Sequence, residues 1–377
     1  MINKISFKNY KLFKEKQTLE IKPITILIGK NNSGKSAVLK LPTLISESLK
    51  GEFSEPISLN SKVNIGKKYE DLFYNKEILS DSIDFEIYDE KETLKVSIIG
   101  DRNYKIEVKE YTLNDLPLKI TKSSLKGFKT SKVKSLNLNY DYIDAFREFP
   151  KEGYLTDIYG KINYIGLSGL NAFKLLAQYK KDNNPLISAI SKWFAINFEG
   201  WNIEIKEIIG SIEGFDFTLS NSKIKNINIL NTGSGIRQVL PLIVRSFMPV
   251  EEETLIIIEE PESHLHPAAH GNLAQRFVES YFEDKNKRYL IETHSENFIL
   301  RLQNMIADPD IPFSPNDLQI YYVDYNEKTQ ESELRPIIIE EDGEIEDWPE
   351  NVFNESVDEV FKLRRNQKKR KENAGKN

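Results

Sequence analysis

One segment of eight residues limits the fold of this 377-residue chain more than any other. It follows the pattern of a phosphate-binding loop: a glycine, four further residues, and then Gly-Lys-Ser. An apolar stretch, residues 23–28, precedes it and is typical of a buried strand, while residues 36–40 are typical of the first turn of a helix. The loop consists of Gly29, Lys30, Asn31, Asn32, Ser33, Gly34, Lys35 and Ser36.

A loop between a strand and a helix points backbone N–H groups and a helix N-terminus at a polyphosphate. Both flanking elements are in place, which favours a nucleotide-binding loop over a glycine-rich turn that matches the pattern by chance. We therefore expect the chain to bind a nucleoside triphosphate. Lys35 would reach the β- and γ-phosphates, and the Ser36 hydroxyl would ligate Mg²⁺.

The composition is that of an ordinary globular protein, with 39% hydrophobic and 29% charged residues. The chain is long enough for two domains or one elaborated domain. No apolar run is long enough to cross a bilayer, and residues 1–7 are typical of a first strand rather than a secretory signal. The chain has no cysteine, which excludes disulfides and thiolate metal sites. We expect a cytoplasmic protein without membrane contact.

Charge is unevenly placed on a chain whose net charge is −6, which argues against a uniformly basic nucleic-acid binder. Residues 104–134 hold eight lysines against three acids, and residues 362–377 hold eight Lys or Arg against one acid. Either run could attract phosphates. A solvated face for the first run and a disordered end for the second are the simpler interpretations, and we favour them.

Strand and helix patterns divide the chain into four parts. Residues 2–28 predict two strands joined by a charged turn at residues 14–16, and the polar region up to about residue 155 contains alternating strands at 82–88 and 94–99. Helical patterns follow at 170–176 and 187–198, short strands at 202–205 and 215–218, and alternating strands and helices from 226. We expect the N-terminal part of a nucleotide-binding head at 1–50, an inserted lobe at 51–225, the C-terminal part of the head at 226–350, and a helix with a basic tail at 351–377.

A second apolar strand, residues 254–258, ends in Glu259 and Glu260. Such a strand delivers carboxylates to its C-terminal end, which is where open α/β sheets bind ligands. Together with a phosphate-binding loop it resembles a Walker B strand. Glu259 would hold the Mg²⁺ shell through water, and Glu260 would polarise the attacking water.

Histidines gather after this strand. His264, His266 and His270 have a spacing that could suggest a metal site, but the chain has no thiolate and no further histidine cluster to complete one. Another apolar strand, residues 289–292, leads to His294, which would lie within reach of a γ-phosphate. Earlier in the chain, an amphipathic helix is preceded by Gly233, Ser234 and Gly235. A glycine-rich helix N-terminus of this kind can bind a second anion, although such triplets are also common in turns.

The order of these motifs resembles the ABC-type ATPases of the SMC, RecF and OLD group. The resemblance is carried by the residues at 7–13, 29–36, 259–267 and 292–295, with a C-terminal part at 317–323 and 343–349 that resembles a bacterial subfamily of these ATPases. It covers the two ends of the chain well and residues 45–225 poorly. It implies an α/β ABC-type ATPase head with mixed β-sheet lobes, crossover helices and an inserted α+β lobe.

The resemblance also implies that ATP and Mg²⁺ bind between two heads, so that one subunit completes the phosphate site of the other. Gly233, Ser234 and Gly235 would then be the signature that acts on the partner's nucleotide. Ser263 and His264 would form the D-loop, and His294 would be the switch histidine.

Three departures from the family pattern bear on hydrolysis. No glutamine lies between Ser36 and Gln178 to fill the usual Q-loop position, for which Asn75 is a weak substitute. The first Walker B acid is Glu259 where many relatives have Asp. Arg237 stands where many relatives have a signature serine. Hydrolysis that is slow or depends on a partner would follow from these differences.

These features predict an ATP-gated switch that works as a homodimer or a larger assembly of dimers. Standalone ATPases of this kind resemble subunits of bacterial anti-phage systems that control a separate effector, such as a toxin or a nuclease. The alternative is a RecF-like or SMC-like DNA-repair ATPase in which the basic segments contact duplex DNA. The nucleotide-binding subunit of a membrane transporter and a hexameric AAA+ motor fit the motifs less well.

Overall fold

The structure is a computed structural model that describes most of the chain. The described residues are 1–59, 61–103, 105–118, 126–129, 133, 136–148, 150–151, 154, 162–208, 214–346, 348–349, 352–353 and 355–374. Parts of the lysine-rich stretch at 104–134, Asp347 and the last residues of the basic tail, expected features of the sequence, lie outside the described residues.

A six-stranded sheet forms the centre of the molecule, in the order β15-β14-β3-β13-β12-β8. Neighbours from β14 to β8 run parallel, and β15 pairs antiparallel with β14. Strands buried on both faces need continuous apolar runs, which β3 and β12 have. The strands are β3 Ile24–Gly29, β8 Asn139–Ile143, β12 Thr254–Glu259, β13 Lys287–Glu292, β14 Leu318–Asn326 and β15 Glu331–Ile337.

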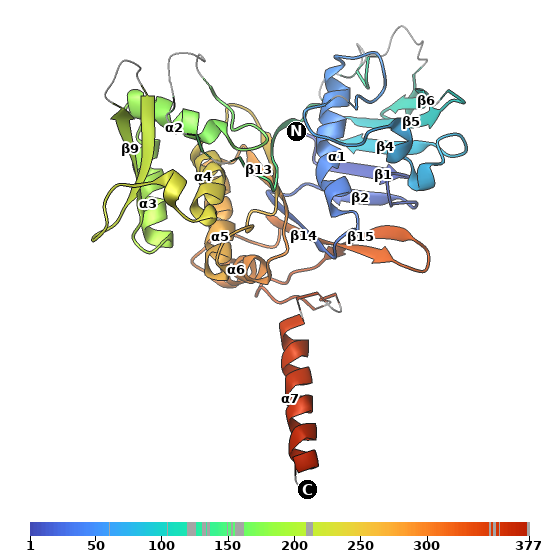
Figure 1. The fold of residues 1–377 in the computed structure, drawn as a ribbon. Coiled ribbons are helices and arrows are strands. Elements are labelled where there is room, and N and C mark those ends of the chain that lie inside the picture. The colour runs from blue at the N-terminus through green and yellow to red at the C-terminus, as the bar shows by residue number, and fades with distance from the viewer. Residues whose placement is uncertain are drawn as a thin grey trace.

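Each face of the central sheet packs into its own hydrophobic core. Successive side chains of a strand point to opposite faces, so Ile256 and Ile258 join one core and Leu255 and Ile257 join the other. The first core is closed by α4 Ser234–Phe247, α5 Pro267–Glu283 and α6 Glu296–Ala307. The second is closed by α1 Lys35–Lys50, so α1 and α4 lie on opposite sides of the central strands (Figure 1).

A second six-stranded sheet, entirely antiparallel, covers the far side of α1 in the order β2-β1-β4-β5-β6-β7. Its residues share one core with α1 and the central sheet, which is why α1 is buried along most of its length. The strands are β1 Lys4–Lys8, β2 Gln17–Glu20, β4 Ile83–Tyr88, β5 Thr93–Gly100, β6 Ile106–Leu113 and β7 Leu116–Pro117.

The N-terminal 28 residues form three strands, where the sequence pattern predicted two. The chain leaves the antiparallel sheet after β2 and enters the central sheet at β3. Pro23 lies at this crossing and has no N–H to donate to a sheet ladder, so the extended chain is interrupted there.

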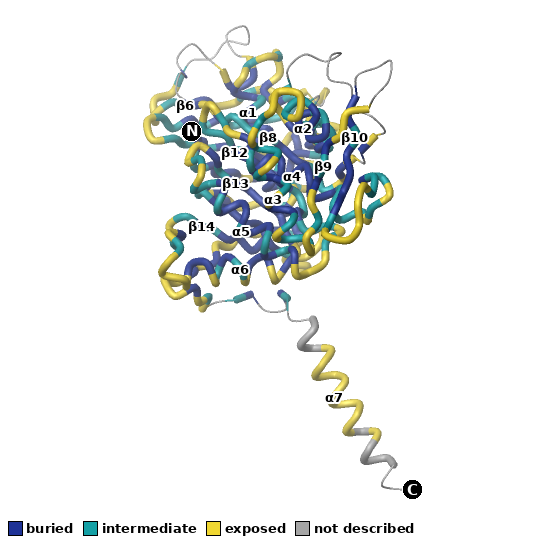
Figure 2. Tube along the Cα trace, turned by 90° about the vertical axis from the view of Figure 1, so that its left-hand side faces the viewer, coloured by how far each residue is buried: buried dark blue, intermediate teal, exposed yellow. Residues whose placement is uncertain are grey.

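Smaller elements complete the fold. A three-stranded sheet, β11-β10-β9, packs with α2 and α3 beyond α4, and α7 extends away from the rest of the molecule (Figure 1). Figure 2 shows the central strands buried and α7 exposed along its described residues. In the described part of the chain no helix is both long enough and apolar enough to span a membrane. These elements are α2 Asn171–Lys181, α3 Leu186–Asn197, α7 Glu355–Ala374, β9 Asn202–Ile208, β10 Gly214–Ser220, β11 Ile227–Asn228, and the 3₁₀ turns η1 Tyr69–Leu72, η2 Tyr74–Lys76 and η3 Ile229–Asn231.

Residues 51–225, expected as one inserted lobe, contribute to several parts of this architecture. They supply β4 to β7 of the antiparallel sheet, β8 at one edge of the central sheet, and α2, α3, β9 and β10 beyond α4. The segment therefore interleaves with the head and places β8 directly beside β12.

Candidate nucleotide-binding site

The phosphate-binding loop connects β3 to α1, as its sequence predicted. Gly29 and Gly34 have φ angles of 151° and 102°, which disfavour any residue with a side chain. A Cβ on Gly29 would lie 2.5 Å from the carbonyl oxygen of Val323 in β14, and one on Gly34 would lie 3.1 Å from the ring of Phe13. The close approach of these neighbours holds the loop in shape.

Lys35 lies inside the loop and is only 4% exposed. Its Nζ donates hydrogen bonds to the carbonyl oxygens of Gly29, at 3.0 Å, and Lys30, at 2.8 Å, and lies 3.8 Å from a carboxylate oxygen of Glu292. Burial lowers the pKa of Lys35, while the carboxylates of Glu292 and Glu260 oppose that shift. A cationic group thus sits where the loop would receive phosphate.

Three carboxylates lie at the ends of two neighbouring strands, and two of them, those of Glu260 and Glu292, act on Lys35. Glu259 and Glu292 are register partners at the ends of β12 and β13, and Glu260 follows β12. The Tyr142 hydroxyl donates a hydrogen bond to Glu259, and Lys40 lies 3.4 Å from the same carboxylate. Parallel pairing therefore brings together, at the C-terminal ends of adjacent strands, acids that are more than thirty positions apart in the sequence.

Glu292 is a site residue that the sequence analysis did not single out. Burial raises its pKa to about 7, and the nearby carboxylates of Glu259 and Glu260 add to the rise, while Lys35 opposes it. The Ser36 hydroxyl donates a hydrogen bond to Glu292 at 3.1 Å. Its signal in the sequence was an acid at the end of an apolar strand, two residues before His294, in the same position as Glu259 in its own strand.

These residues surround a pocket of about 620 Å³. His294 stands exposed in its lining, and partial desolvation together with the Lys35 ammonium lowers the pKa of His294. Of the residues predicted for the loop and its acids, Gly29, Lys30, Ser33 and Glu259 do not line the pocket, whereas the other loop residues, Glu260 and His294 do. The lining residues are Leu12, Asn31, Asn32, Gly34, Lys35, Ser36, Ala37, Glu260, Glu292 and His294.

The oxygens gathered here fit a hard divalent cation. Mg²⁺ is usually held by one or two carboxylates, a hydroxyl, waters and the substrate phosphates rather than by a cage of protein side chains. Ser36, Glu259 and Glu292 offer such groups, and a cation would offset the burial of the Glu292 carboxyl and its repulsion by the neighbouring carboxylates, which together raise its pKa. Among the described residues, no group of three or more His, Cys, Asp or Glu side chains could hold a metal ion.

The start of α4 holds Gly233, Ser234 and Gly235, none of which lines the pocket of their own chain. Gly235 packs against the D-loop segment, since a Cβ there would lie 2.9 Å from the carbonyl oxygen of His264. The Ser263 hydroxyl donates a hydrogen bond to Glu260 at 2.9 Å. The predicted signature and the predicted D-loop are therefore neighbours, and the predicted D-loop contacts Glu260, the predicted Walker B acid.

The clustered histidines have separate roles in the structure. His266 caps α5 by accepting a hydrogen bond from the N–H of Ala268, and His270 is hydrogen-bonded to Ser295 at 2.7 Å. His264 is exposed and has a φ angle of 68°. Their spacing thus reflects a turn and a helix start.

Asn75 and Arg237 are two positions at which the sequence departs from the family pattern, and the structure shows where each one lies. Asn75 lies in η2 with a φ angle of 50° and does not contribute to the lining of the pocket. Arg237 donates a hydrogen bond to the carbonyl oxygen of Leu230, beside the start of α4.

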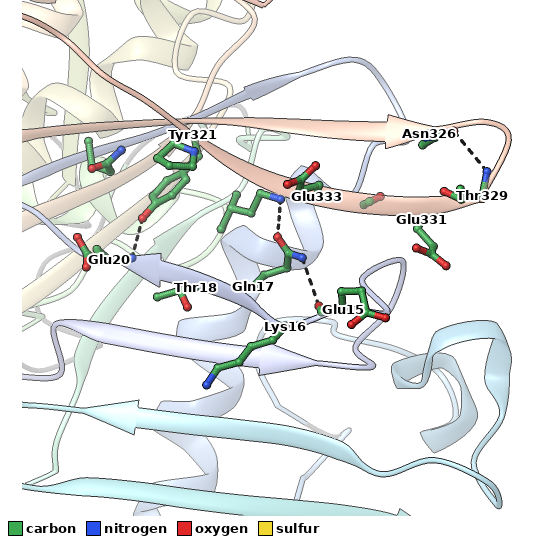
Figure 3. Close-up of a pocket in the computed structure, with 14 residues that line it drawn as sticks. Glu15, Lys16, Gln17, Thr18, Glu20, Tyr321, Asn326, Thr329, Glu331 and Glu333 are labelled. Carbon is green, nitrogen blue, oxygen red and sulfur yellow. Dashed lines mark hydrogen bonds between the residues drawn. The ribbon is translucent and has the colours of Figure 1, made fainter. Parts of the chain in front are cut away.

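A second and larger pocket, of about 740 Å³, lies between the edge strands β2 and β15 (Figure 3). Gln17 in β2 accepts a hydrogen bond from the N–H of Leu334 in β15, and Tyr321 in β14 accepts one from the N–H of Glu20 in β2. Ser332 connects this pocket to the phosphate-binding loop, because its hydroxyl donates to the carbonyl oxygen of Ser33 at 2.7 Å. The pocket backs the loop and contains none of its phosphate-facing groups.

Comparison with known proteins agrees with this geometry. Residues 24–301 match the AAA_21 family, described as AAA domain, putative AbiEii toxin, Type IV TA system. The chain belongs to the AAA_21 family. Residues 313–363 also match DUF3696, a family of proteins of unknown function. A curated relative, an ATP/GTP phosphatase of Helicobacter pylori (strain ATCC 700392 / 26695), is 24% identical over 345 residues, which cover 82% of this chain and 90% of the relative.

Solved structures show the same fold at low identity. An SMC head bound to the C-winged helix domain of ScpA has a TM-score of 0.54 and 14% identity, with 90% of this chain and 98% of that chain covered. An SMC head with an extended coiled coil, bound to the C-terminal domain of ScpA derived from Pyrococcus furiosus, has a TM-score of 0.50 and 13% identity, with 89% and 96% covered. The expected α/β class with an ABC-type, SMC-like head is confirmed, and this AAA_21 member is an ATPase.

Proposed function

We propose that this ATPase is a dimeric switch, closed by ATP and released by hydrolysis. The proposal rests on the observation that the residues predicted to contact the phosphates do not all line one pocket. Lys35, Glu260, Glu292 and His294 line the pocket at the phosphate-binding loop, whereas no residue of the glycine-rich start of α4 lines it. A second head could supply that helix start and complete the phosphate site.

Each residue at the loop has a role in this proposal. Lys35 and the loop N–H groups bind the β- and γ-phosphates, and His294 contacts the γ-phosphate from the rim of the pocket. Mg²⁺, held by Ser36 and by Glu259 through water, would supply neutralisation of phosphate charge when bound. Glu260 orients the attacking water and receives its proton, with one carboxylate oxygen held by Ser263.

A Glu260→Gln variant tests the switch directly. It keeps the size of the side chain but removes the carboxylate, so it should bind ATP, fail to hydrolyse it and accumulate as a closed dimer. Light scattering with size-exclusion chromatography would measure the mass with and without ATP and Mg²⁺. Lys35→Ala is the control, because it should lose nucleotide binding and show no change of mass. A Glu260→Gln chain that binds ATP and stays monomeric contradicts the composite site.

The output we propose is control of a separate effector, a toxin or a nuclease, in a bacterial anti-phage system in the cytoplasm. The description of the AAA_21 family as a putative toxin of a type IV toxin–antitoxin system supports an output of this kind. The same Glu260→Gln chain with ATP serves as bait in a native pull-down. A stoichiometric protein that wild type releases on hydrolysis supports the proposal, and capture of duplex DNA without a protein partner contradicts it.

One observation favours the alternative, a DNA-repair ATPase. Helix α7 extends from the molecule and carries exposed cations that could contact phosphates. The described cations of this helix are Lys362, Arg364, Arg365, Lys368 and Arg370.

A further inference from the structure

Arg147 is the most deeply buried charged residue beside the site, and no sequence motif pointed to it. It follows β8 and is 0% exposed. Its Nη2 donates hydrogen bonds to the carbonyl oxygens of Glu259, at 2.8 Å, and Glu260, at 3.1 Å. One guanidinium nitrogen therefore holds both carbonyls that flank the Cα of Glu260.

The backbone at Glu260 needs such support. Its φ angle is 40°, a left-handed conformation that residues with a side chain rarely adopt. The next residue is Pro261, whose ring further restricts the residue that precedes it. Conformations of this kind persist only where the surroundings hold them, and they cluster at functional sites. Besides the two hydrogen bonds from Arg147, this backbone is held by a hydrogen bond from the N–H of Glu260 to the carbonyl oxygen of Glu292, at 2.9 Å.

Arg147 is also tied to the start of α4. Gln238, which is 4% exposed, donates a hydrogen bond from Nε2 to the carbonyl oxygen of Arg147 at 2.8 Å. Gln238 lies one helical turn after Ser234, within the first turns of the predicted signature helix. The contact joins the helix that would meet a partner's nucleotide to the loop that carries Glu260.

Several polar atoms of this network are buried and unpaired. Nε and Nη1 of Arg147, Oε1 of Gln238 and Oε2 of Glu262 have no hydrogen-bond partner in the part of the chain that the structure describes. Burial lowers the pKa of Arg147 to about 10, opposed first by the carboxylate of Glu262, so the guanidinium stays charged at neutral pH. Buried polar groups are normally hydrogen-bonded, so these atoms leave the network with unused hydrogen-bonding capacity.

We propose that Arg147 is a positioning residue, which holds the strained backbone of Glu260 so that its carboxylate faces the pocket, and which links that geometry to α4 through Gln238. This inference rests on the proposed role of Glu260 in hydrolysis. Arg147 touches no reacting group, so its loss should affect turnover and leave nucleotide affinity nearly intact.

The test compares Arg147→Met and Arg147→Lys with wild type. Turnover would be measured as phosphate release per nucleotide-binding site, and affinity by titration with a non-hydrolysable ATP analogue. We expect Arg147→Met to lower kcat roughly 10- to 100-fold, because small misplacements of a reacting group have effects of that size. The Kd and KM should stay within about threefold of wild type. Arg147→Lys should regain part of the loss, since an ammonium can still donate to a carbonyl.

Arg276→Met is the matched control. Arg276 is an equally well buried arginine, 3% exposed, whose guanidinium bonds to Ser246 and Glu283 in α4 and α5 rather than to the Walker B loop. It should lower the stability of the protein without changing kcat per binding site. Normalising to binding sites removes the effect of unfolded protein, and Arg147→Lys keeps the test valid if Arg147→Met does not fold.

The outcomes separate this inference from the proposed function. If Glu260→Gln abolishes hydrolysis and both Arg147 variants turn over like wild type, Glu260 keeps its role and the inference about Arg147 is overturned. It is also overturned if the variants raise Kd while kcat per site is unchanged. If Glu260→Gln itself hydrolyses ATP at the wild-type rate, the proposed function fails first.

Discussion

Glu292 illustrates how a single residue acquires its chemistry from its neighbours. An isolated glutamate has an ordinary pKa of 4.5, but burial at the end of β13 beside Glu259 and Glu260 raises the pKa of Glu292 to about 7. Its carboxylate touches Ser36 and lies near Lys35, so its charge bears on both groups proposed to meet phosphate and Mg²⁺. The residue is therefore sensitive to pH in the range where the protein would work.

Replacing Glu292 by Gln should make the nucleotide-free protein less sensitive to pH. Since the folded pKa lies above the unfolded value, the unfolded chain releases this proton first, and wild type loses stability as the pH rises from about 4.5 to about 7. The loss amounts to at most about 3 kcal/mol, and the glutamine variant should not show it. Chemical denaturation at pH 5 and pH 8, without Mg²⁺, would measure the difference. Parallel stability profiles for the two proteins would contradict a raised pKa.

At the scale of elements, two glycines at the start of α4 can show whether the phosphate site is complete within one chain or shared between two. Gly235 faces its own chain, since an added Cβ would meet the carbonyl oxygen of His264 at 2.9 Å. Gly233 faces open space, with nothing within 4 Å of an added Cβ. A side chain at Gly233 therefore disturbs nothing in the single chain and would interfere only with what approaches α4 from outside.

Gly233→Leu should leave thermal stability and nucleotide binding of the single chain unchanged, yet abolish hydrolysis if a second head binds there. Gly235→Leu should also abolish hydrolysis while sparing binding, but with a lower melting temperature, because the side chain collides with the D-loop. Differential scanning fluorimetry, nucleotide titration and phosphate release would be measured for both. Normal turnover by Gly233→Leu would argue that α4 does not act on a partner's nucleotide.

At the scale of the whole molecule, one central sheet separates two hydrophobic cores, and the site lies at the C-terminal ends of its parallel strands. The strands β3, β13 and β12 end side by side, which brings together the phosphate-binding loop, Glu259 and Glu260, and His294. Helix α7 lies outside both cores, and its described cations are exposed. Its exposed cations are placed to contact a large polyanion without disturbing the head.

Changing Lys362, Arg364 and Arg365 to Gln tests this. If the ATPase binds duplex DNA through α7, affinity should fall, and the dependence of log Kd on log salt should become shallower by roughly one per cation removed. Lys223→Gln with Lys225→Gln is a control that removes exposed cations from a distant loop. Fluorescence anisotropy with a labelled duplex at several salt concentrations would measure both. Absence of binding at low salt would weigh against the DNA-repair alternative.

The sequence by itself determined the features whose parts lie close together in the chain. The strand, loop and helix around Gly29–Ser36, the strand that ends at Glu259, and the helix that follows Gly233 are set by local apolar periodicity and by glycines. Such patterns need no knowledge of distant contacts, so motif order was sufficient to identify the α/β head. The prediction of two strands over residues 2–28 was wrong, because periodicity does not show that the chain changes sheets at Pro23.

Only the tertiary structure decided which distant segments share the site. Pairing of β8 with β12 brings Tyr142 and Arg147 to the Walker B acids across more than a hundred positions, and pairing of β12 with β13 brings Glu292 to Glu259. Neither pairing has a local pattern, because the apolar runs of β12 and β13 do not show which strand lies beside them, and the half-buried edge strand β8, Asn-Tyr-Asp-Tyr-Ile, is not an apolar run at all. The raised pKa of Glu292 and the supported backbone of Glu260 exist only once those strands are adjacent, since both depend on charges and hydrogen bonds from other parts of the chain.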